Sequence, residues 1–185
     1  ALGGTAVGTG LNAPAAFAPL AIQKISAITG IPFVKAENYF EALAGRDAVV
    51  ETSGHLKTVA VSLLKIANDL RWLNSGPRCA IGEIILPSLQ PGSSIMPGKV
   101  NPVIPESIMM LCATVIGNDS AITIGGQHGN FELNTMMPMI AYHLLESIRL
   151  LAQGSHILVE RCIAGIQANR ERAESLIENS LAMCT

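Results

Sequence analysis

The sequence predicts an all-α protein: a bundle of long helices interrupted by one long irregular loop, in which a short hairpin could form. Apolar residues recur at alternating steps of three and four over long stretches, which is the spacing of helices packed in a bundle seam. Apolar residues make up 49% of the 185 residues and the mean hydropathy is +0.41, so a sizeable core can form. Between residues 76 and 102 the pattern changes to proline, glycine and serine, which marks a loop.

The first predicted helix covers about residues 14–29. Asn12 and Pro14 open it and Gly30 closes it, since these residue types favour the two ends of a helix. The glycine-rich run Gly3–Gly10 precedes this helix and lacks the Gly-Lys-Ser/Thr sequence of a phosphate loop. We therefore interpret it as a bend or a place where helices pack closely.

A long helix is predicted at about 47–74, followed by the irregular segment. Gly76 and Pro77 end it, because glycine caps helix termini and proline cannot continue the hydrogen-bond ladder. Within the irregular segment, the apolar run Ile84–Leu86 is where a small hairpin is predicted. The stripe that predicts the helix consists of Leu56, Val59, Leu63, Ile66, Leu70 and Leu73.

Two more long helices and one shorter helix complete the prediction. The second long helix starts directly after Pro102, and its apolar stripe is interrupted by Asn118, a polar seam residue of the kind that fixes helix register. A helix at about 169–183 is opened by Asn169. The stripe of the second long helix is Ile104, Ile108, Leu111, Val115 and Ile122. That of the third is Met137, Ala141, Leu144, Ile148, Leu151, Ser155, Leu158 and Cys162.

Composition excludes several classes of partner. Twelve basic and fourteen acidic residues give a net charge of −2, and few residues are aromatic, so we expect no nucleic-acid partner. No stretch offers the ~20 continuous apolar residues that span a bilayer, so no membrane partner is expected either. So little charge predicts an apolar face that meets other subunits. The cysteines match no zinc pattern and are expected to be buried free thiols: Cys79, Cys112, Cys162 and Cys184.

The end of the irregular loop has the composition of an anion site. Gly92 and Gly98 allow a close approach of backbone to a ligand, and Pro102 suits the first turn of the helix that follows. The positive end of that helix favours a carboxylate or an oxyanion. An ordinary connection with a solvated lysine is the alternative. The side chains available to an anion are Ser93, Ser94, Lys99 and Asn101.

Residues 92–102, GSSIMPGKVNP, resemble the signature loop of the fumarase/aspartase superfamily of tetrameric helical lyases. Similar segments at 1–12, 65–84 and 129–134 extend the resemblance over most of the chain, the latter two being closer to class II fumarases than to aspartases. The residues after the loop, 101–106, follow an aspartase-like NPVxPE pattern. The resemblance implies that residues 1–185 are an incomplete central helical-bundle domain, an internal fragment without the N- and C-terminal parts of the family chain.

The resemblance also implies a reaction: reversible anti addition of water to fumarate, giving (S)-malate through an aci-carboxylate, without a metal or cofactor. Ser93 matches the family's proton-abstracting base, and N–H groups of the loop would lower the pKa of its hydroxyl. Glu106 matches a glutamate that supports a histidine, and that histidine is absent here. The residues matching substrate ligands are Ser94, Lys99, Val100 and Asn101. The histidines that do not match are His55, His128, His143 and His156.

Three functions stay open on the sequence alone. Fumarate hydratase is the first, with fumarate and malate as ligands and a homotetramer whose active sites are each assembled from three subunits, so that this chain alone would be inactive. Aspartate ammonia-lyase would use the same base with ammonia as leaving group. A non-catalytic helical assembly domain could retain the loop without the chemistry. Reduced cysteines and the resemblance favour the bacterial cytoplasm or the mitochondrial matrix.

Overall fold

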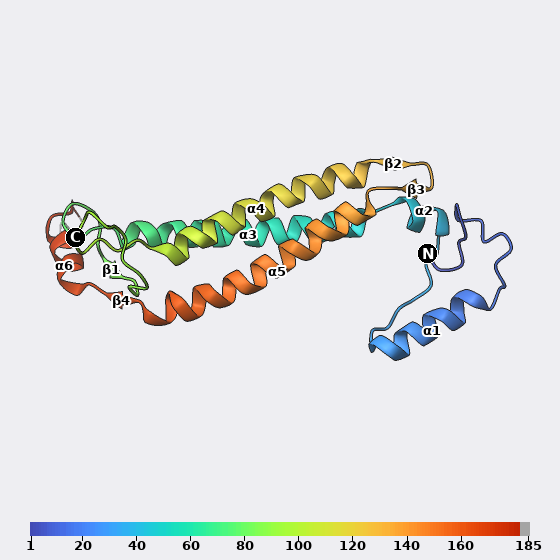
Figure 1. Ribbon diagram of the computed structural model, residues 1–185, viewed down its shortest axis with the longest axis horizontal. Coiled ribbons are helices and arrows are strands. Elements are labelled where there is room, and N and C mark those ends of the chain that lie inside the picture. Colours follow the sequence, from blue (N-terminus) through green and yellow to red (C-terminus); the bar gives the residue numbers. More distant parts are fainter. Residues whose placement is uncertain (182–185) are drawn as a thin grey trace. The chain divides into compact units, whose positions relative to one another are not determined.

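The computed structural model describes residues 1–181 and confirms the all-α class (Figure 1). The long helices are α3 (Asp47–Leu73), α4 (Val103–Gln127) and α5 (Met137–Arg161), close to the predicted positions. Shorter helices and two-residue strands complete the described chain: α1 (Phe17–Thr29), α2 (Tyr39–Ala44), β1 (Ile84–Ile85), β2 (Gly129–Asn130), β3 (Leu133–Asn134), a 3-10 turn (Ile163–Gly165), β4 (Gln167–Ala168) and α6 (Arg170–Glu178).

The chain divides into two compact units. The first unit comprises residues 1–54 and 119–144, and the second comprises residues 55–118 together with the chain from residue 145 onward. Each of the long helices continues from one unit into the other. The loop that resembles a lyase signature belongs to the second unit.

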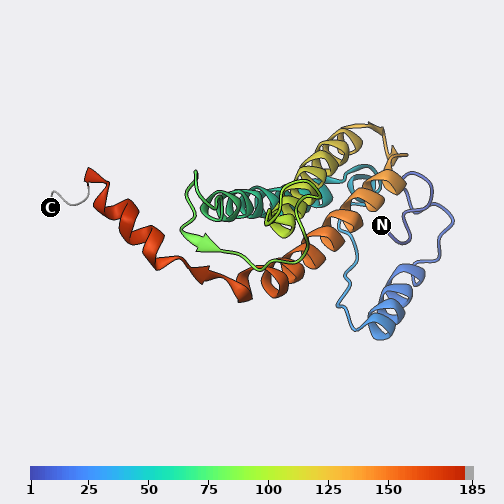
Figure 2. The ribbon, with the colours of Figure 1, turned by 60° about the vertical axis from the view of Figure 1, so that its left-hand side comes forward.

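The core of the second unit lies between α3, α4 and α5, which run side by side there (Figures 1 and 2). On α4 the buried face follows the predicted seam at Ile108 and Val115, with Cys112 in place of the half-buried Leu111. The small residues Ala60 and Ala67 are fully buried on α3, which allows the helices to approach closely. The cluster comprises Ala60, Ala67, Leu86, Ile108, Cys112, Val115, Leu151, Leu158 and Cys162.

The predicted seam of α5 is wrong in its first half. Met137 and Ile148 are 47% and 43% exposed, whereas Ile140 and Ser147 are buried. The buried face contains small residues that a search for large apolar side chains passes over. Gly154 is the clearest case: a Cβ there would lie 2.6 Å from Leu111 Cδ2, so only glycine fits the contact as it stands.

Asn118 is a buried polar seam residue, as predicted. It is 6% exposed, and its Nδ2 donates to Glu146 Oε2 at 3.1 Å and to Ser147 Oγ at 3.2 Å. A buried amide left without partners is costly, so these bonds disfavour a shift of α4 along α5.

The predicted hairpin at Ile84–Leu86 is wrong, because the strand there pairs with a distant segment and not with a neighbouring one. The strand forms, but β1 pairs antiparallel with β4, and Ile84 lies opposite Ala168 (Figure 2). Among the described residues, β2 and β3 form a local hairpin in the first unit. The apolar pattern of the sequence predicts a short strand, but it cannot identify a pairing partner more than eighty residues away along the chain.

The first unit contains more irregular chain than predicted. Residues 1–16 have no helix, and α1 begins at Phe17 without a side-chain cap, so Asn12 does not open it. Gly30 closes α1 in the left-handed conformation, as predicted. The glycine-rich start is a close-packed bend: Gly8 has φ +95°, and a Cβ there would lie 2.8 Å from the Phe40 nitrogen. The short α2 was not predicted.

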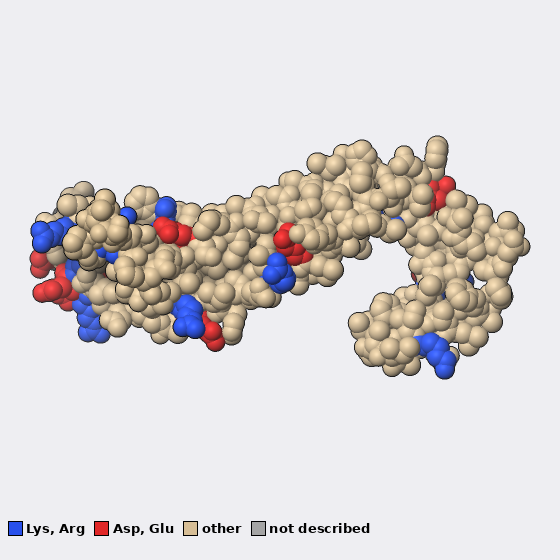
Figure 3. Space-filling view, in the orientation of Figure 1, with Lys and Arg blue, Asp and Glu red and all other residues tan. Residues whose placement is uncertain are grey.

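Helix α6 is opened by Asn169, as predicted, through its Oδ1, which accepts from the Arg172 N–H at 3.3 Å. It ends at Glu178 instead of about residue 183. The remainder of that prediction, and Cys184, lie partly or wholly outside the described residues. On the face shown in Figure 3, charged side chains gather over α6 and the neighbouring loops, and fewer lie over the long helices of the second unit.

Among the described residues, α4 is long and apolar enough to cross a membrane, with a mean hydropathy of 1.4 over its most apolar window. That window is 39% buried. Ile108, Cys112 and Val115 are in the core of the second unit, and the polar Asn118 is bonded within it. These are features of a central helix in a bundle.

We predict that Gly154→Ala has a free energy of unfolding about 1–3 kcal/mol lower than that of Gly117→Ala, because the added Cβ at residue 154 overlaps Leu111 while both variants share the gain in helix propensity. The cost should fall when Leu111→Ala is added, and urea denaturation of the four variants of the cycle measures this coupling. Gly117→Ala, at an exposed position of α4, is the control, since a Cβ at Gly117 meets nothing within 4 Å. Equal stability of Gly154→Ala and Gly117→Ala would contradict the packing described.

We predict that Cys79 is alkylated by iodoacetamide at neutral pH well before Cys112 and Cys162. Cys79 is exposed, contrary to expectation, whereas Cys112 and Cys162 are buried and free, as expected. Burial raises the pKa of both buried thiols, so less of the reactive thiolate is present at a given pH. Mass mapping before and after denaturation checks the order, and early labelling of Cys112 would be the contrary result.

Candidate active site

The signature-like loop connects β1 to α4. Residues 86–102 contain no helix or strand, as predicted for this segment. Gly92 and Ser93 are half-buried, whereas the residues from Ser94 to Val100 are exposed. The side chains at the tip of the loop are therefore accessible to a ligand or to another subunit.

A backbone hydrogen bond closes the loop tip. The Gly92 N–H donates to the Lys99 carbonyl at 2.8 Å, and the Lys99 N–H donates to the Met96 carbonyl at 3.2 Å. A Cβ on Gly92 would lie 2.7 Å from the Lys99 oxygen and 2.9 Å from the Asn101 nitrogen. The absence of a side chain at Gly92 is thus what allows the two ends of the tip to meet. Gly98 has φ +77°, a conformation that also favours glycine.

Ser93 lies at the start of the closed tip, where its hydroxyl oxygen accepts two backbone hydrogen bonds. The Ile95 and Met96 N–H groups each donate to Ser93 Oγ at 3.2 Å. Two N–H donors stabilise an oxyanion on Oγ more than the neutral hydroxyl, so a larger fraction of the serine can exist as the alkoxide that accepts a proton. The sequence predicted loop N–H groups in this place, and the structure identifies them as those of Ile95 and Met96.

Of the predicted anion ligands, Lys99 and Asn101 are bonded to Gly92, and the others are exposed residues of the tip. The Lys99 backbone is bonded to Gly92, and its exposed side chain extends from the tip. Ser94 and Val100 are both exposed, on either side of Lys99 and the tip. Asn101 Nδ2 donates to the Gly92 carbonyl at 3.3 Å, so one of the two amide hydrogens assigned to a ligand is used inside the loop. Asn101 thus contributes to the closure of the tip.

Helix α4 begins directly after the loop. The Pro102 carbonyl accepts from the Glu106 N–H at 3.1 Å, so Pro102 caps the helix instead of occupying its first turn. Glu106 lies in the first turn and is half-buried, as predicted. The Val103 N–H donates to the Asn101 carbonyl at 2.9 Å, and Pro105 has no N–H. The helix start therefore offers fewer free donors to an anion than the sequence suggested.

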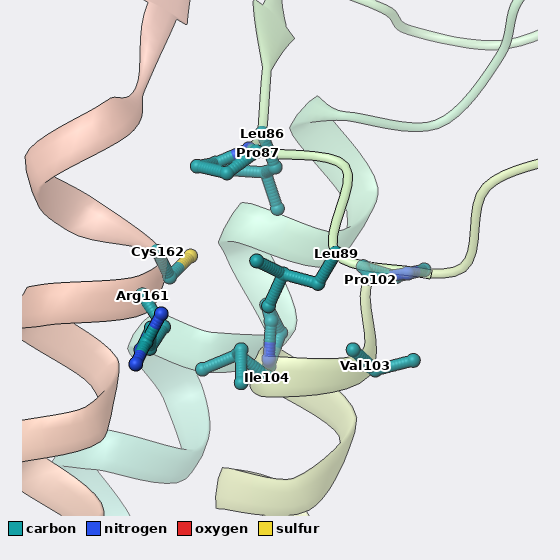
Figure 4. A pocket seen from close by; sticks show the side chains of 9 residues that line it. Leu86, Pro87, Leu89, Pro102, Val103, Ile104, Arg161 and Cys162 are labelled. Carbon is teal, nitrogen blue, oxygen red and sulfur yellow. The ribbon is translucent and has the colours of Figure 1, made fainter. Parts of the chain in front are cut away.

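A small apolar cavity lies beside the base of the loop (Figure 4). Leu86, Pro87 and Leu89 of the entering chain face the start of α4 on one side and the end of α5 on the other. Its volume is about 10 Å³, room for a single water, against ~300 Å³ or more for a ligand pocket. It is lined by Leu86, Pro87, Leu89, Pro102, Val103, Ile104, Pro105, Arg161 and Cys162.

The four histidines lie on different elements, two of them on α5. His128 and His55 are exposed, His156 lies 3.3 Å from Glu160 on the surface of α5, and His143 contacts the Tyr142 ring edge-on. Within residues 1–181, no group of three or more His, Cys, Asp or Glu side chains could hold a metal ion.

Sequence reasoning missed Arg172 as a neighbour of this loop. Its guanidinium donates to two carbonyls of the chain that enters the loop, Ala80 at 2.6 Å and Ile81 at 2.9 Å. The available signal was a conflict: Arg172 lies in the first turn of α6, where the helix dipole disfavours a cation. Such a conflict indicates that the side chain has a partner elsewhere.

Comparison with known proteins identifies similar chains. A family model described as a lyase matches residues 1–117. The chain is 56% identical over its whole length to a class II fumarate hydratase of Ralstonia nicotianae and 55% identical to mitochondrial fumarate hydratase 1 of Arabidopsis thaliana. It covers 40% and 38% of those two proteins, so it spans about two fifths of the length of these curated relatives.

Solved structures agree with these relatives. A structure described as fumarate lyase:delta crystallin from Brucella melitensis, bound to cobalt, has a TM-score of 0.93 and 51% identity. That match covers 98% of this chain and 39% of the other. A class II fumarase from Schistosoma mansoni has a TM-score of 0.91 and 38% identity, over 95% of this chain and 40% of the other.

We predict that Gly92→Ala opens the loop tip, because its Cβ would overlap the Lys99 carbonyl and break the closing hydrogen bond. Trypsin should then cleave after Lys99 several times faster, since proteases cut exposed chain that can open locally. Ile95→Ala is the matched control, because Ile95 is exposed and the variant keeps its N–H. The closure would be disproved by equal cleavage rates in Gly92→Ala and the unsubstituted protein, measured by mass spectrometry.

Proposed function

The chain belongs to the lyase family that matches its residues 1–117, within the fumarase/aspartase superfamily, and from this premise we propose that the protein is a class II fumarate hydratase. Residues 1–185 would supply its central helical bundle and one wall of the active site. The single observation that carries the proposal is the closed serine loop, in which Ile95 and Met96 donate to Ser93 Oγ beside the Lys99 backbone.

In the proposed dehydration direction, Ser93 Oγ takes the proton from the carbon next to one carboxylate of malate. The electron pair left behind spreads into that carboxylate, giving the aci-carboxylate dianion. The Lys99 ammonium and the second Asn101 amide hydrogen stabilise this added charge. The hydroxyl on the neighbouring carbon then leaves as water, with a proton from an acid outside this chain. Hydration of fumarate runs through the same steps in reverse.

The loop geometry supports Ser93 as the base for a physical reason. A serine hydroxyl is almost entirely neutral at physiological pH, so it abstracts a proton only where its alkoxide is stabilised. Two backbone donors on Oγ supply part of that stabilisation without any cost of reorganisation during the reaction. Lys99 and the start of α4 add positive potential at the same end of the loop.

Glu106 is proposed to act on the substrate indirectly, through a histidine. Its place in the first turn of α4 suits a carboxylate that orients and charges a histidine supplied from outside this chain. Ser94 and Val100, both exposed in the loop tip, would contact the substrate carboxylates.

We propose that the protein works as a homotetramer with shared active sites. The described surface of α3–α5 in the second unit exposes many large apolar side chains, which suits burial against helices of other subunits. The apolar side chains include Val59, Val61, Ile66, Met110, Leu145, Ile148, Ile157 and Val159. A site completed by neighbours would explain why the loop tip is exposed here. We propose the bacterial cytoplasm or the mitochondrial matrix as its location, which is consistent with relatives from bacteria and relatives named mitochondrial.

Aspartate ammonia-lyase is disfavoured among the alternatives. The relatives described above are named for fumarate hydration, and the sequence similarity to them extends over the whole of this chain. A non-catalytic assembly domain would need the helical bundle but would not need a serine whose hydroxyl oxygen accepts two N–H donors. Substrate choice separates these functions directly, since only a hydratase turns over malate.

We predict that the intact protein converts malate to fumarate, followed by absorbance of the double bond, and that Ser93→Ala slows this by about 10²–10⁴-fold through loss of the base. Lys99→Met should slow it by at least about 10²-fold through loss of charge stabilisation. Ser107→Ala, an exposed serine on α4, is the control and should retain activity.

Two results would overturn the proposal. Turnover of aspartate without turnover of malate would assign an ammonia-lyase. Undiminished malate turnover in both Ser93→Ala and Lys99→Met would remove this loop from the chemistry altogether.

A further inference from the structure

Four consecutive carbonyl groups on the chain that enters the serine loop are bound by the start of α6. Arg172 Nη2 donates to the Ala80 carbonyl at 2.6 Å and its Nε donates to that of Ile81 at 2.9 Å. Asn169 Nδ2 donates to the Gly82 carbonyl at 3.0 Å, and the Asn169 N–H donates to that of Glu83 at 2.9 Å. We call these contacts the α6 clasp: Asn169 and Arg172 with the carbonyls of residues 80–83.

Arginine is specifically suited to its part of the clasp. Its planar guanidinium presents several N–H donors in a fixed arrangement, so one side chain can bind two neighbouring carbonyls at once. A lysine in the same place has a single donor atom. The position also opposes the dipole of α6, since Arg172 lies in the first turn of the helix. Its position is therefore not explained by the stability of α6 alone.

The clasp continues without a break into the rest of the loop entry. Ile84 and Ile85 pair with Ala168 and Gln167 in the β1–β4 ladder. The Leu86 N–H donates to Asn74 Oδ1 at 2.9 Å, at the end of α3. Leu86, Pro87 and Leu89 then pack beside the start of α4 around the small cavity (Figure 4).

The two ends of the loop are held in different ways. At its exit, Pro102 leads directly into α4, a long helix packed in the core. At its entry there is no helix, and residues 80–86 are held by the clasp, the β1–β4 ladder and Asn74. The Gly92–Lys99 bond joins the entering chain to the exiting chain, so the place of Ser93 depends on both.

We propose that Arg172 is a positioning residue for the proposed reaction: by binding the carbonyls of Ala80 and Ile81 it fixes the entry of the loop and thereby the place of Ser93. This inference rests on the proposed function, because it gives Arg172 a part in holding the base of that reaction. Arg172 itself bonds to backbone at the loop entry, apart from the loop tip.

The test compares three variants in the intact protein. Arg172→Met removes both donors and keeps much of the apolar side chain. Arg172→Lys keeps the charge and one donor. Arg170→Met is the matched control, because Arg170 is exposed on the first turn of the same helix and makes none of the clasp contacts. The measurements are malate turnover, the urea midpoint and hydrogen exchange across the whole chain.

We expect Arg172→Met to lower kcat/KM by about tenfold or more, since small displacements of a catalytic group have large effects on rate. Arg172→Lys should restore part of the loss and Arg170→Met should change the rate less than about twofold. Exchange should rise in residues 80–101, including the Ile95 and Met96 amides that bind Ser93, while exchange in the core of α3 and α4 stays unchanged.

Several outcomes would overturn the inference. One is an unchanged rate in Arg172→Met, whatever the exchange shows. A second is a lower rate with faster exchange throughout the core, which indicates a merely structural role. A third is equal loss in Arg170→Met. If the unsubstituted protein does not turn over malate, the proposed function is refuted instead. In that case hydrogen exchange still tests the inference, because unchanged exchange in residues 90–101 of Arg172→Met shows that Arg172 does not position the loop.

Discussion

The backbone hydrogen bond between the Gly92 N–H and the Lys99 carbonyl is the contact on which the arrangement of the loop tip depends. It forms only because Gly92 has no side chain, and it brings the two ends of the tip together. Within the closed tip, the Ile95 and Met96 N–H groups donate to the Ser93 hydroxyl oxygen, and the Asn101 amide donates to the Gly92 carbonyl. The serine that the sequence singled out thus has two backbone N–H donors on its hydroxyl oxygen, the surroundings that favour an oxyanion.

The helical bundle gives this loop a rigid foundation at its exit. Small residues such as Ala60, Ala67 and Gly154 let α3, α4 and α5 pack closely, and the Asn118 amide is bonded to Ser147 within the seam. Because α4 is fixed in this way, Pro102 and Glu106 have defined places at its first turn. Catalytic groups placed on rigid elements keep their geometry better than groups on free loops.

Sequence reasoning predicted the long helices and the loop because both depend on local patterns. The apolar stripe of α4, the glycine at residue 30 and the cap at Asn169 each act within a few residues of their own position. The failures involve distant partners or small side chains. The strand at Ile84 pairs with residue 168, and the seam of α5 uses Ser147 and Gly154, which carry no apolar signal. The bonds from Asn101 to Gly92 and from Arg172 to Ala80 depend on loop conformation, which spacing alone does not encode.

The antiparallel pairing of β1 with β4 has a consequence for the order in which the protein is made. Ile84 leaves the ribosome long before Ala168, its partner in the ladder, and Arg172 follows later still. Domains form progressively from the N-terminus during synthesis, at roughly 5–20 residues per second. The nascent chain therefore carries its serine segment for several seconds before the β1–β4 ladder and the α6 clasp can form, and premature termination before residue 168 yields a product that lacks both.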